Sequence, residues 1–295
     1  MNKQETEKII AAGKILSQTR EYAKKFIKKG MPLLEIAEKI ETKIVELGGK
    51  PAFPTNLSIN DIAAHYTPSY NDETLAEGLL KIDLGAHIDG WVADGAFSID
   101  LENKEENKKL IKASEDALKN AVVSVKKQEL VGKVGKIIQE TIESQKASPI
   151  INLSGHSIEQ YDLHSGVNIP NHASSEKTVF EEGIYAIEPF ATYGSGRVYD
   201  GKPSGIYELI DLKNVRSPIA RKVLDYVIEE YDHLPFCSRW LVKKFGTSAL
   251  IGLKQLEENG NLMQFAQLVE TTHKNVAQSE HTVLISGNKV IVTTE

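Results

Sequence analysis

The chain has 295 residues, of which 41% are hydrophobic and 26% charged, and its formal net charge is -6 at pH 7. A chain of this length can bury a sizeable core, and its composition is that of a globular protein. The negative net charge argues against a general role in nucleic-acid binding. The single cysteine, Cys237, excludes an internal disulfide and is typical of a reducing compartment.

The N-terminal segment MNKQETEKII lacks the apolar run of a signal peptide, and its acidic residues disfavour an organelle transit peptide. No stretch approaches 18 consecutive apolar residues, the minimum for a membrane-spanning helix. These features predict a soluble, cytoplasmic protein with no membrane partner.

Two helices open the predicted order of elements. Apolar residues at helical spacing predict one helix over 5–29 and another from Pro32 to Leu47, each followed by glycine. A hairpin follows at 80–97. A second pair of helices and a second group of strands come next: helices at about 105–126 and 131–145, and strands at 149–153, 183–191 and 205–212. This recurring order of elements, without a sequence repeat, predicts a pseudo-symmetric α+β domain.

The stretch 213–272 interrupts this order and is predicted to be mainly helical. Pro218 begins a helix through Tyr231, and Thr247 or Ser248 can cap another that ends near Asn259. Strands return at 280–286 and 289–294. We therefore expect residues 1–212 and 273–295 to form one domain, with 213–272 as a helical insertion subdomain.

The hairpin in 80-LKIDLGAHIDGWVADGAF-97 carries two aspartates. A tight turn at Asp89-Gly90 places Asp83 diagonally across from Asp94, with both side chains on one face of the sheet. Paired aspartates in a hairpin are usually only solvated turn residues. A covered pair of like charges, however, is costly without a cation, so this spacing suggests a metal site.

Three more potential metal ligands lie in apolar, strand-like surroundings. They are His156 in 150-IINLSGHSIEQYDLHSG-166, Glu188 in 184-IYAIEPF-190 and Glu280 in 276-VAQSEHTVLI-285. Singly, such a glutamate is more often solvated, and such a histidine more often serves as a hydrogen-bond donor. Together with the two aspartates they suit two divalent ions such as Mn, Fe, Co or Zn. Two ions that share carboxylates can acidify a water for hydrolysis.

The chain resembles the type 2 methionine aminopeptidases in their short, archaeal form, from about residue 4 to residue 295. The resemblance is carried by the motifs PAFPTNLSINDIAAHYTP, KIDLGAHIDGWVAD, NLSGHSIEQYDLHSG, AIEPFAT, LPFCSRWL and QSEHT. It implies the pita-bread fold, in which two α+β halves place helices outside a curved antiparallel sheet. It also implies a helical subdomain between Glu188 and Glu280, the segment that distinguishes type 2 from type 1.

The resemblance implies a role for eleven residues. The metal ligands would be Asp83, Asp94, His156, Glu188 and Glu280, holding two ions (Co, Mn, Fe or Zn), with Glu188 also the general acid and base. The substrate-contacting catalytic histidines would be His65 and His164, and the methionine pocket would be lined by Phe53, Leu163, Phe190 and Phe265. Two departures from the family pattern are the lack of prolines after Phe265 and Ser279 in place of a phenylalanine.

The resemblance implies an enzyme that removes the N-terminal methionine from nascent proteins and prefers substrates whose second residue is small. It also implies a monomer that acts near the ribosome. One alternative is an X-Pro aminopeptidase or prolidase with the same ligand set. The AAHYTP and LPFCSRWL motifs favour the methionine-specific branch. A non-catalytic binding protein of the same fold is a second alternative, but such relatives have lost metal ligands, and all five are present here.

Overall fold

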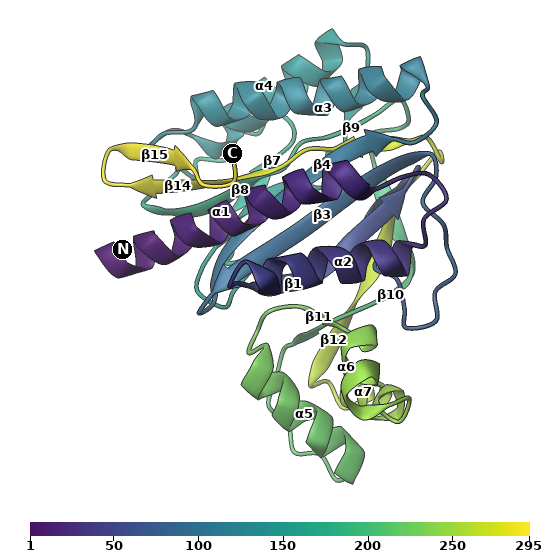
Figure 1. The fold of residues 1–295 in the computed structure, drawn as a ribbon. Helices are drawn as coiled ribbons and strands as arrows, with labels where there is room; N and C mark the ends of the chain where they lie inside the picture. The colour runs from purple at the N-terminus through teal and green to yellow at the C-terminus, as the bar shows by residue number, and fades with distance from the viewer.

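Four long helices cover one side of the strands in the structure, a computed structural model that describes residues 1–295 (Figure 1). They are α1 (Lys3–Phe26), α2 (Leu33–Glu46), α3 (Glu105–Ser124) and α4 (Val131–Ser144). Helices α1 and α2 lie across one half of the strands, and α3 and α4 across the other. The four predicted helices are confirmed, with ends that differ by at most three residues.

The N-terminus of α1 shows why a helix begins there. The Asn2 side chain accepts a hydrogen bond from the Glu5 backbone N–H (3.0 Å), and the Glu5 carboxylate accepts one from the Asn2 backbone N–H (2.8 Å). This reciprocal capping box satisfies donors that the first turn cannot pair internally. The buried face of the helix, which includes Leu16, then packs on β3 and β4.

The strands form four antiparallel sheets. The first sheet has the order β1 (Lys50–Ile59), β3 (Leu79–Ile88), β4 (Trp91–Asp100). The second has the order β11 (Phe236–Cys237), β10 (Val198–Leu209), β12 (Leu262–Glu270), β2 (Ile62–Ala64). The third is β13 (Val276–Gln278), β9 (Phe190–Thr192), β5 (Ser148–Pro149). The fourth is β15 (Lys289–Val292), β14 (His281–Ser286), β8 (Gly183–Ile187), β6 (Ser154–Ile158), β7 (Asn168–Pro170).

The predicted hairpin is confirmed, including its register. Asp89 and Gly90 both have positive φ (48° and 80°), as the turn requires, and Asp83 lies opposite Ala96 while Asp94 lies opposite Gly85. Other strands differ in extent from the prediction. The strand expected at 183–191 is broken at residues 188–189, and the one expected at 205–212 begins at residue 198 and ends at residue 209.

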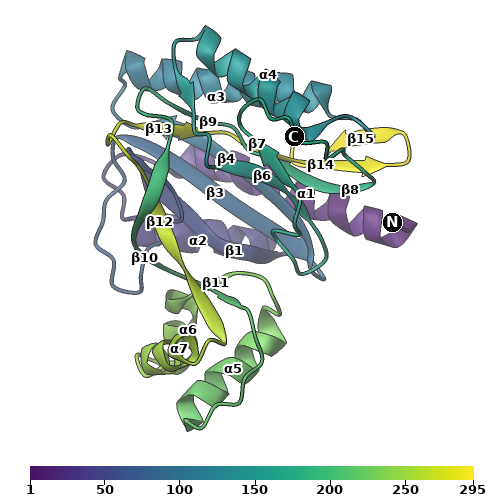
Figure 2. The same cartoon turned by 180° about the vertical axis from the view of Figure 1, so that it is seen from behind.

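A separate group of three helices lies at one end of the molecule, at the bottom of Figures 1 and 2: α5 (Pro218–Glu230), α6 (Ser238–Phe245) and α7 (Ala249–Glu258). They share a small apolar core that includes Val223, Leu241 and Leu253. The expectation of a mainly helical stretch over 213–272 missed strand β12, which pairs with β10 on one side and β2 on the other. The long strands β10 and β12 lead from the three helices back to the main body (Figure 2). The structure contains no helix that is both long and apolar enough to span a membrane.

Candidate metal centre and active site

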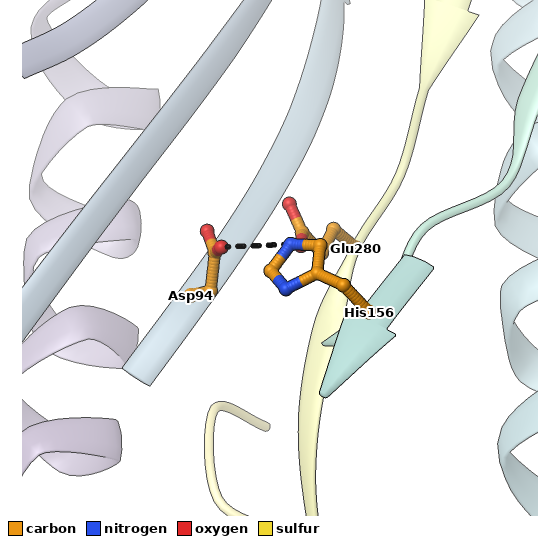
Figure 3. A group of neighbouring side chains, drawn as sticks. All are labelled: Asp94, His156 and Glu280. Carbon is orange, nitrogen blue, oxygen red and sulfur yellow. Dashed lines mark ion pairs between the residues drawn. The ribbon is translucent and has the colours of Figure 1, made fainter. Parts of the chain in front are cut away.

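Five side chains that are far apart in sequence meet between the two halves of the molecule. Asp83 comes from β3, Asp94 from β4 and His156 from β6, while Glu188 lies between β8 and β9, and Glu280 between β13 and β14. They form two groups that share Glu280: Asp94, His156 and Glu280, and Asp83, Glu188 and Glu280. Within each group the potential ligand atoms all lie within 4.8 Å of one another. Figure 3 shows the first group, with Asp94 and His156 pointing toward each other from different strands.

Glycines permit the close packing that brings these strands together. A Cβ at Gly155, next to His156, would lie 2.2 Å from the Ala186 carbonyl oxygen on the neighbouring strand. A Cβ at Gly85, opposite Asp94, would lie 2.3 Å from the Phe53 ring. No side chain fits at either position unless the backbone or the ring moves.

The four carboxylates have too few hydrogen-bond donors for their burial. Asp83 Oδ1, Asp94 Oδ1 and both oxygens of Glu280 are buried without a hydrogen-bond partner. Burial raises the pKa of Asp83, and burial together with the neighbouring acids raises the pKa values of Asp94, Glu188 and Glu280. Several buried acids without donors fit a site for divalent cations, which would neutralise the charge and use the free oxygens.

His156 is a buried imidazole that is neutral in this environment. Burial lowers its pKa to about 3, so the ring is uncharged at neutral pH. Its Nδ1 faces the Ser157 carbonyl oxygen at 3.4 Å, and that oxygen can only accept a hydrogen bond. The proton therefore belongs on Nδ1, which leaves the lone pair of Nε2 directed at Asp94 Oδ2, 3.7 Å away (Figure 3).

A cavity opens next to this cluster, and ten of the eleven predicted site residues line it. They are Phe53, His65, Asp83, Asp94, His156, Leu163, His164, Glu188, Phe190 and Phe265. The eleventh, Glu280, is buried behind the cavity wall. The predicted residues therefore share one location, a cavity lined by acids, histidines and apolar side chains.

His65 has a fixed orientation at the cavity wall. Its backbone has a φ of +63°, an unusual conformation for a residue with a side chain. Its Nδ1 lies 3.2 Å from the Ala266 carbonyl oxygen, and the Phe265 ring packs edge-on against the imidazole, with ring centroids 5.3 Å apart. Burial lowers the pKa of His65 to about 4, so the neutral ring carries its proton on Nδ1 and presents Nε2 as an acceptor.

His164 packs against His156, with ring centroids 4.4 Å apart. Its backbone N–H donates to Asp162 Oδ1 (3.1 Å), which fixes the loop that carries the ring. Burial lowers the pKa of His164 as well, so both histidines beside the carboxylates favour the neutral form.

Gln278 belongs to the site although nothing in the sequence predicted it. Its amide Nε2 donates to Asp83 Oδ2 (3.2 Å) and to Glu188 Oε1 (2.9 Å), so one side chain joins two of the carboxylates. The only signal was its place in the QSEHT motif, two residues before Glu280. Ser279 in the same motif points away from the cavity, and its hydroxyl lies 2.9 Å from that of Ser114 on α3.

The fold and this cluster define a metal-dependent hydrolase. The chain belongs to metallopeptidase family M24, whose sequence model matches residues 7–286. It is 47% identical over 292 residues to the methionine aminopeptidase of Methanocaldococcus jannaschii, covering 98% of each chain. It is 45% identical over 296 residues to the methionine aminopeptidase of Pyrococcus horikoshii, covering 99% of this chain and all of the relative.

Solved structures confirm the predicted pita-bread fold. A methionine aminopeptidase from Thermotoga maritima superimposes with a TM-score of 0.72 at 23% identity, covering 100% of this chain and 98% of that one. At such identity the similarity concerns the fold alone. The metallopeptidase family and the buried carboxylate–histidine cluster together indicate a site for divalent metal ions.

Proposed function

We propose that the protein is a methionine aminopeptidase that removes the N-terminal methionine from proteins and peptides by hydrolysis. The observation that carries this proposal is the 47% identity to a methionine aminopeptidase over 98% of both chains. The cavity that holds all but one of the predicted site residues agrees with it.

We further propose the type 2 form of this enzyme, as found in archaea. The support is the group of helices over 218–258, which lies in the sequence between Glu188 and Glu280. We also propose a cytoplasmic monomer that acts on nascent chains beginning with methionine, close to the ribosome.

Asp83, Asp94, His156, Glu188 and Glu280 would hold two divalent ions, with Mn, Fe, Co and Zn as the candidates for this donor set. When bound, the ions would lower the pKa of a water and polarise the scissile carbonyl. Glu280 belongs to both groups of ligand atoms, so its carboxylate is the candidate for a ligand shared by the two ions.

Glu188 is proposed as the proton carrier. Its Oε1 accepts a hydrogen bond from Gln278, and the residue lines the cavity. It lies beside Asp83 and Asp94 at the cavity, where a water held by the ions would be within its reach. It would take a proton from the attacking water and give it to the leaving amine.

The two cavity histidines are proposed to hold the peptide. With its proton on Nδ1, His65 offers Nε2 to the N–H of the bond that is cut, on the side of the leaving nitrogen. His164, beside His156, is in a position to donate to the carbonyl oxygen of the same peptide. The acceptor role of His65 requires the neutral imidazole that its lowered pKa favours, whereas His164 can donate in its neutral form as well.

The apolar part of the cavity is proposed to select methionine. Phe53, Leu163, Phe190 and Phe265 line it, and aromatic rings make favourable contacts with a thioether of about 0.3–1.5 kcal/mol each. A small second residue in the substrate is part of the same proposal.

A peptidase assay with the purified chain tests the function. We expect cleavage of Met-Ala-Ser in the presence of Mn, Fe, Co or Zn, and no cleavage of an X-Pro dipeptide under the same conditions. Cleavage of the X-Pro dipeptide alone would support a prolidase-like enzyme instead. Cleavage of neither, with metal shown to be bound, would leave a binding protein of the same fold.

A further inference from the structure

Strand β4 and the segment 278–282 lie side by side at the metal centre, although they belong to different sheets. The Glu280 backbone N–H donates to the Ala96 carbonyl oxygen at 2.9 Å. Two residues away on each side, the partners are Ser98 with Gln278, and Asp94 with Thr282. The two segments therefore run antiparallel in a regular register, without forming an ordinary backbone ladder at these two flanking positions.

Hydroxyl groups make the contact at both flanking positions. Thr282 Oγ1 donates to the Asp94 carbonyl oxygen (2.8 Å) and accepts from the Asp94 backbone N–H (2.7 Å). Ser98 Oγ donates to the Gln278 carbonyl oxygen (2.7 Å) and accepts from the Gln278 backbone N–H (2.9 Å). Each hydroxyl thus satisfies both backbone polar groups of one residue on the opposite segment.

The residues held in this way carry or orient the carboxylates. Thr282 holds Asp94, the direct contact between the segments is made by Glu280 itself, and Ser98 holds Gln278. The Gln278 amide in turn donates to Asp83 and Glu188. Three of the four acids are therefore connected to this pair of hydroxyls, Asp94 directly and Asp83 and Glu188 through one amide, while Glu280 is held by its own backbone hydrogen bond to Ala96.

We propose that Thr282 and Ser98 are positioning residues, whose hydroxyls fix the register between the two halves of the metal centre. Thr282 is fully buried, so no water replaces a lost hydroxyl, and the Asp94 backbone N–H and carbonyl would both lack a partner. Asp94 would then shift relative to Glu280. The inference rests on the proposed function, because it concerns the residues proposed there as metal ligands.

The test compares Thr282→Val with Thr282→Ser in the full chain. Valine keeps the shape of threonine without its hydroxyl, and serine keeps the hydroxyl without the methyl group. We expect Thr282→Val to weaken Mn²⁺ binding about 10–100-fold in calorimetry, the usual effect of losing a group that orients a ligand. We expect Thr282→Ser to bind Mn²⁺ like the wild type. The visible spectrum of the Co²⁺-loaded protein should change in the valine variant only.

Thr19→Val is the matched control. Thr19 is also fully buried, but its hydroxyl donates to the Ile15 carbonyl oxygen within α1 and not to a residue of the metal centre. This variant should bind Mn²⁺ with wild-type affinity. Ser98→Ala provides a second test should Thr282→Val fail to fold, with a weaker affinity for Mn²⁺ again expected.

The outcomes separate this inference from the function on which it rests. Wild-type affinity and an unchanged Co²⁺ spectrum in Thr282→Val, or in Ser98→Ala if that variant is used, would overturn the positioning role. The same is true of a lower melting temperature without a change in affinity. A wild-type chain that binds no Mn²⁺ and does not cleave Met-Ala-Ser would instead overturn the proposed function.

Discussion

Two buried glutamates, Glu270 and Glu280, lie ten residues apart in the sequence and differ in the hydrogen-bond donors around their carboxylates. Glu270 is fully buried, and its two oxygens accept five hydrogen bonds from Ser195, Thr272 and Lys274, at 2.6–3.1 Å. Burial acts to raise its pKa, but these donors outweigh burial, so the pKa is lowered. Glu280 is almost as deeply buried, but its two carboxylate oxygens have no hydrogen-bond partner and its pKa is raised.

A third acid, Glu41, shows another way to bury a carboxylate. It receives two hydrogen bonds from the Arg239 guanidinium (2.7 and 2.8 Å) and one from Trp240 Nε1 (2.9 Å). The protein thus satisfies one buried acid with hydroxyls and amides and another with its own cation. Around Glu280 it places further acids instead. The difference indicates that the charge of the Glu280 carboxylate is neutralised by a bound cation and not by a side chain of the protein.

The largest effect is expected from Glu280→Ala. It removes the one residue common to both groups of ligand atoms, so Mn²⁺ binding and turnover should both be lost. Metal catalysis supplies several kcal/mol, which corresponds to a loss of more than about 10³-fold in kcat/KM. Glu270→Gln is the control, and calorimetry with Mn²⁺ should give the wild-type affinity for it. Equal metal binding by Glu280→Ala and the wild type would contradict the assignment.

Arg239→Met tests the acid that has its own cation. It leaves the buried Glu41 carboxylate without a partner, and breaking a buried pair in this way costs about 3–5 kcal/mol of stability. Urea unfolding measures the loss. The double variant Glu41→Gln/Arg239→Met should lose less than Arg239→Met alone, since no buried charge remains. An Arg239→Met loss that is the same with or without Glu41 would show that the pair contributes little.

Metal removal should show how much the buried carboxylates lower the free energy of unfolding. Without metal, burial raises the pKa of Asp83 to about 7, above its ordinary value of 3.8. The folded state then binds the proton more tightly than the unfolded state, so this contribution to stability is present at low pH and is lost as the pH rises from about 4 to 7. Mn²⁺ at 100 times its Kd should restore about 2.7 kcal/mol at pH 8.

Asp83→Asn isolates this contribution. In the presence of a chelator, the variant should be more stable than the wild type at pH 8, and the difference should shrink toward pH 5. Urea unfolding at the two pH values gives the comparison. If the metal-free wild type were more stable than Asp83→Asn at pH 8, repulsion and burial of the carboxylates would not be destabilising the folded state.

The smallest effect is expected from His65→Ala, which changes the cavity wall but none of the carboxylates. Loss of one preorganised hydrogen-bonding group should lower kcat by about 10²-fold. Mn²⁺ affinity should stay at the wild-type value, and the two measurements together separate a substrate contact from a metal ligand. A parallel loss of metal affinity would place His65 among the ligands instead.

The hairpin with Asp83 and Asp94 could be predicted from the residues themselves because its turn fixes its register locally. The convergence of His156, Glu188 and Glu280 depends on pairing between strands far apart in sequence, such as β6 with β8 and β8 with β14. Local patterns cannot give that pairing: they marked those three residues as candidates, and only the resemblance to a family joined them to the two aspartates in one site.

Strand β12 was missed for a similar reason. The sequence LMQFAQLVE lacks the alternation of apolar and polar residues that is typical of a strand with one covered face. In the structure its central residues are all half-buried, which agrees with this pattern. It is a strand because β10 and β2 pair with it on either side. Gln278 and Thr282 escaped notice because amides and hydroxyls acquire a role only through the distant groups that they contact.

Strand β12 connects the three-helix group to the cavity wall. It begins close to the end of α7, and it carries both Phe265, which packs on the His65 ring, and Ala266, whose carbonyl oxygen fixes that ring. The orientation of the His65 imidazole therefore depends on a strand that also leads to the three-helix group. None of the four carboxylates lies on β12, so this link concerns the cavity wall and not the proposed metal ligands.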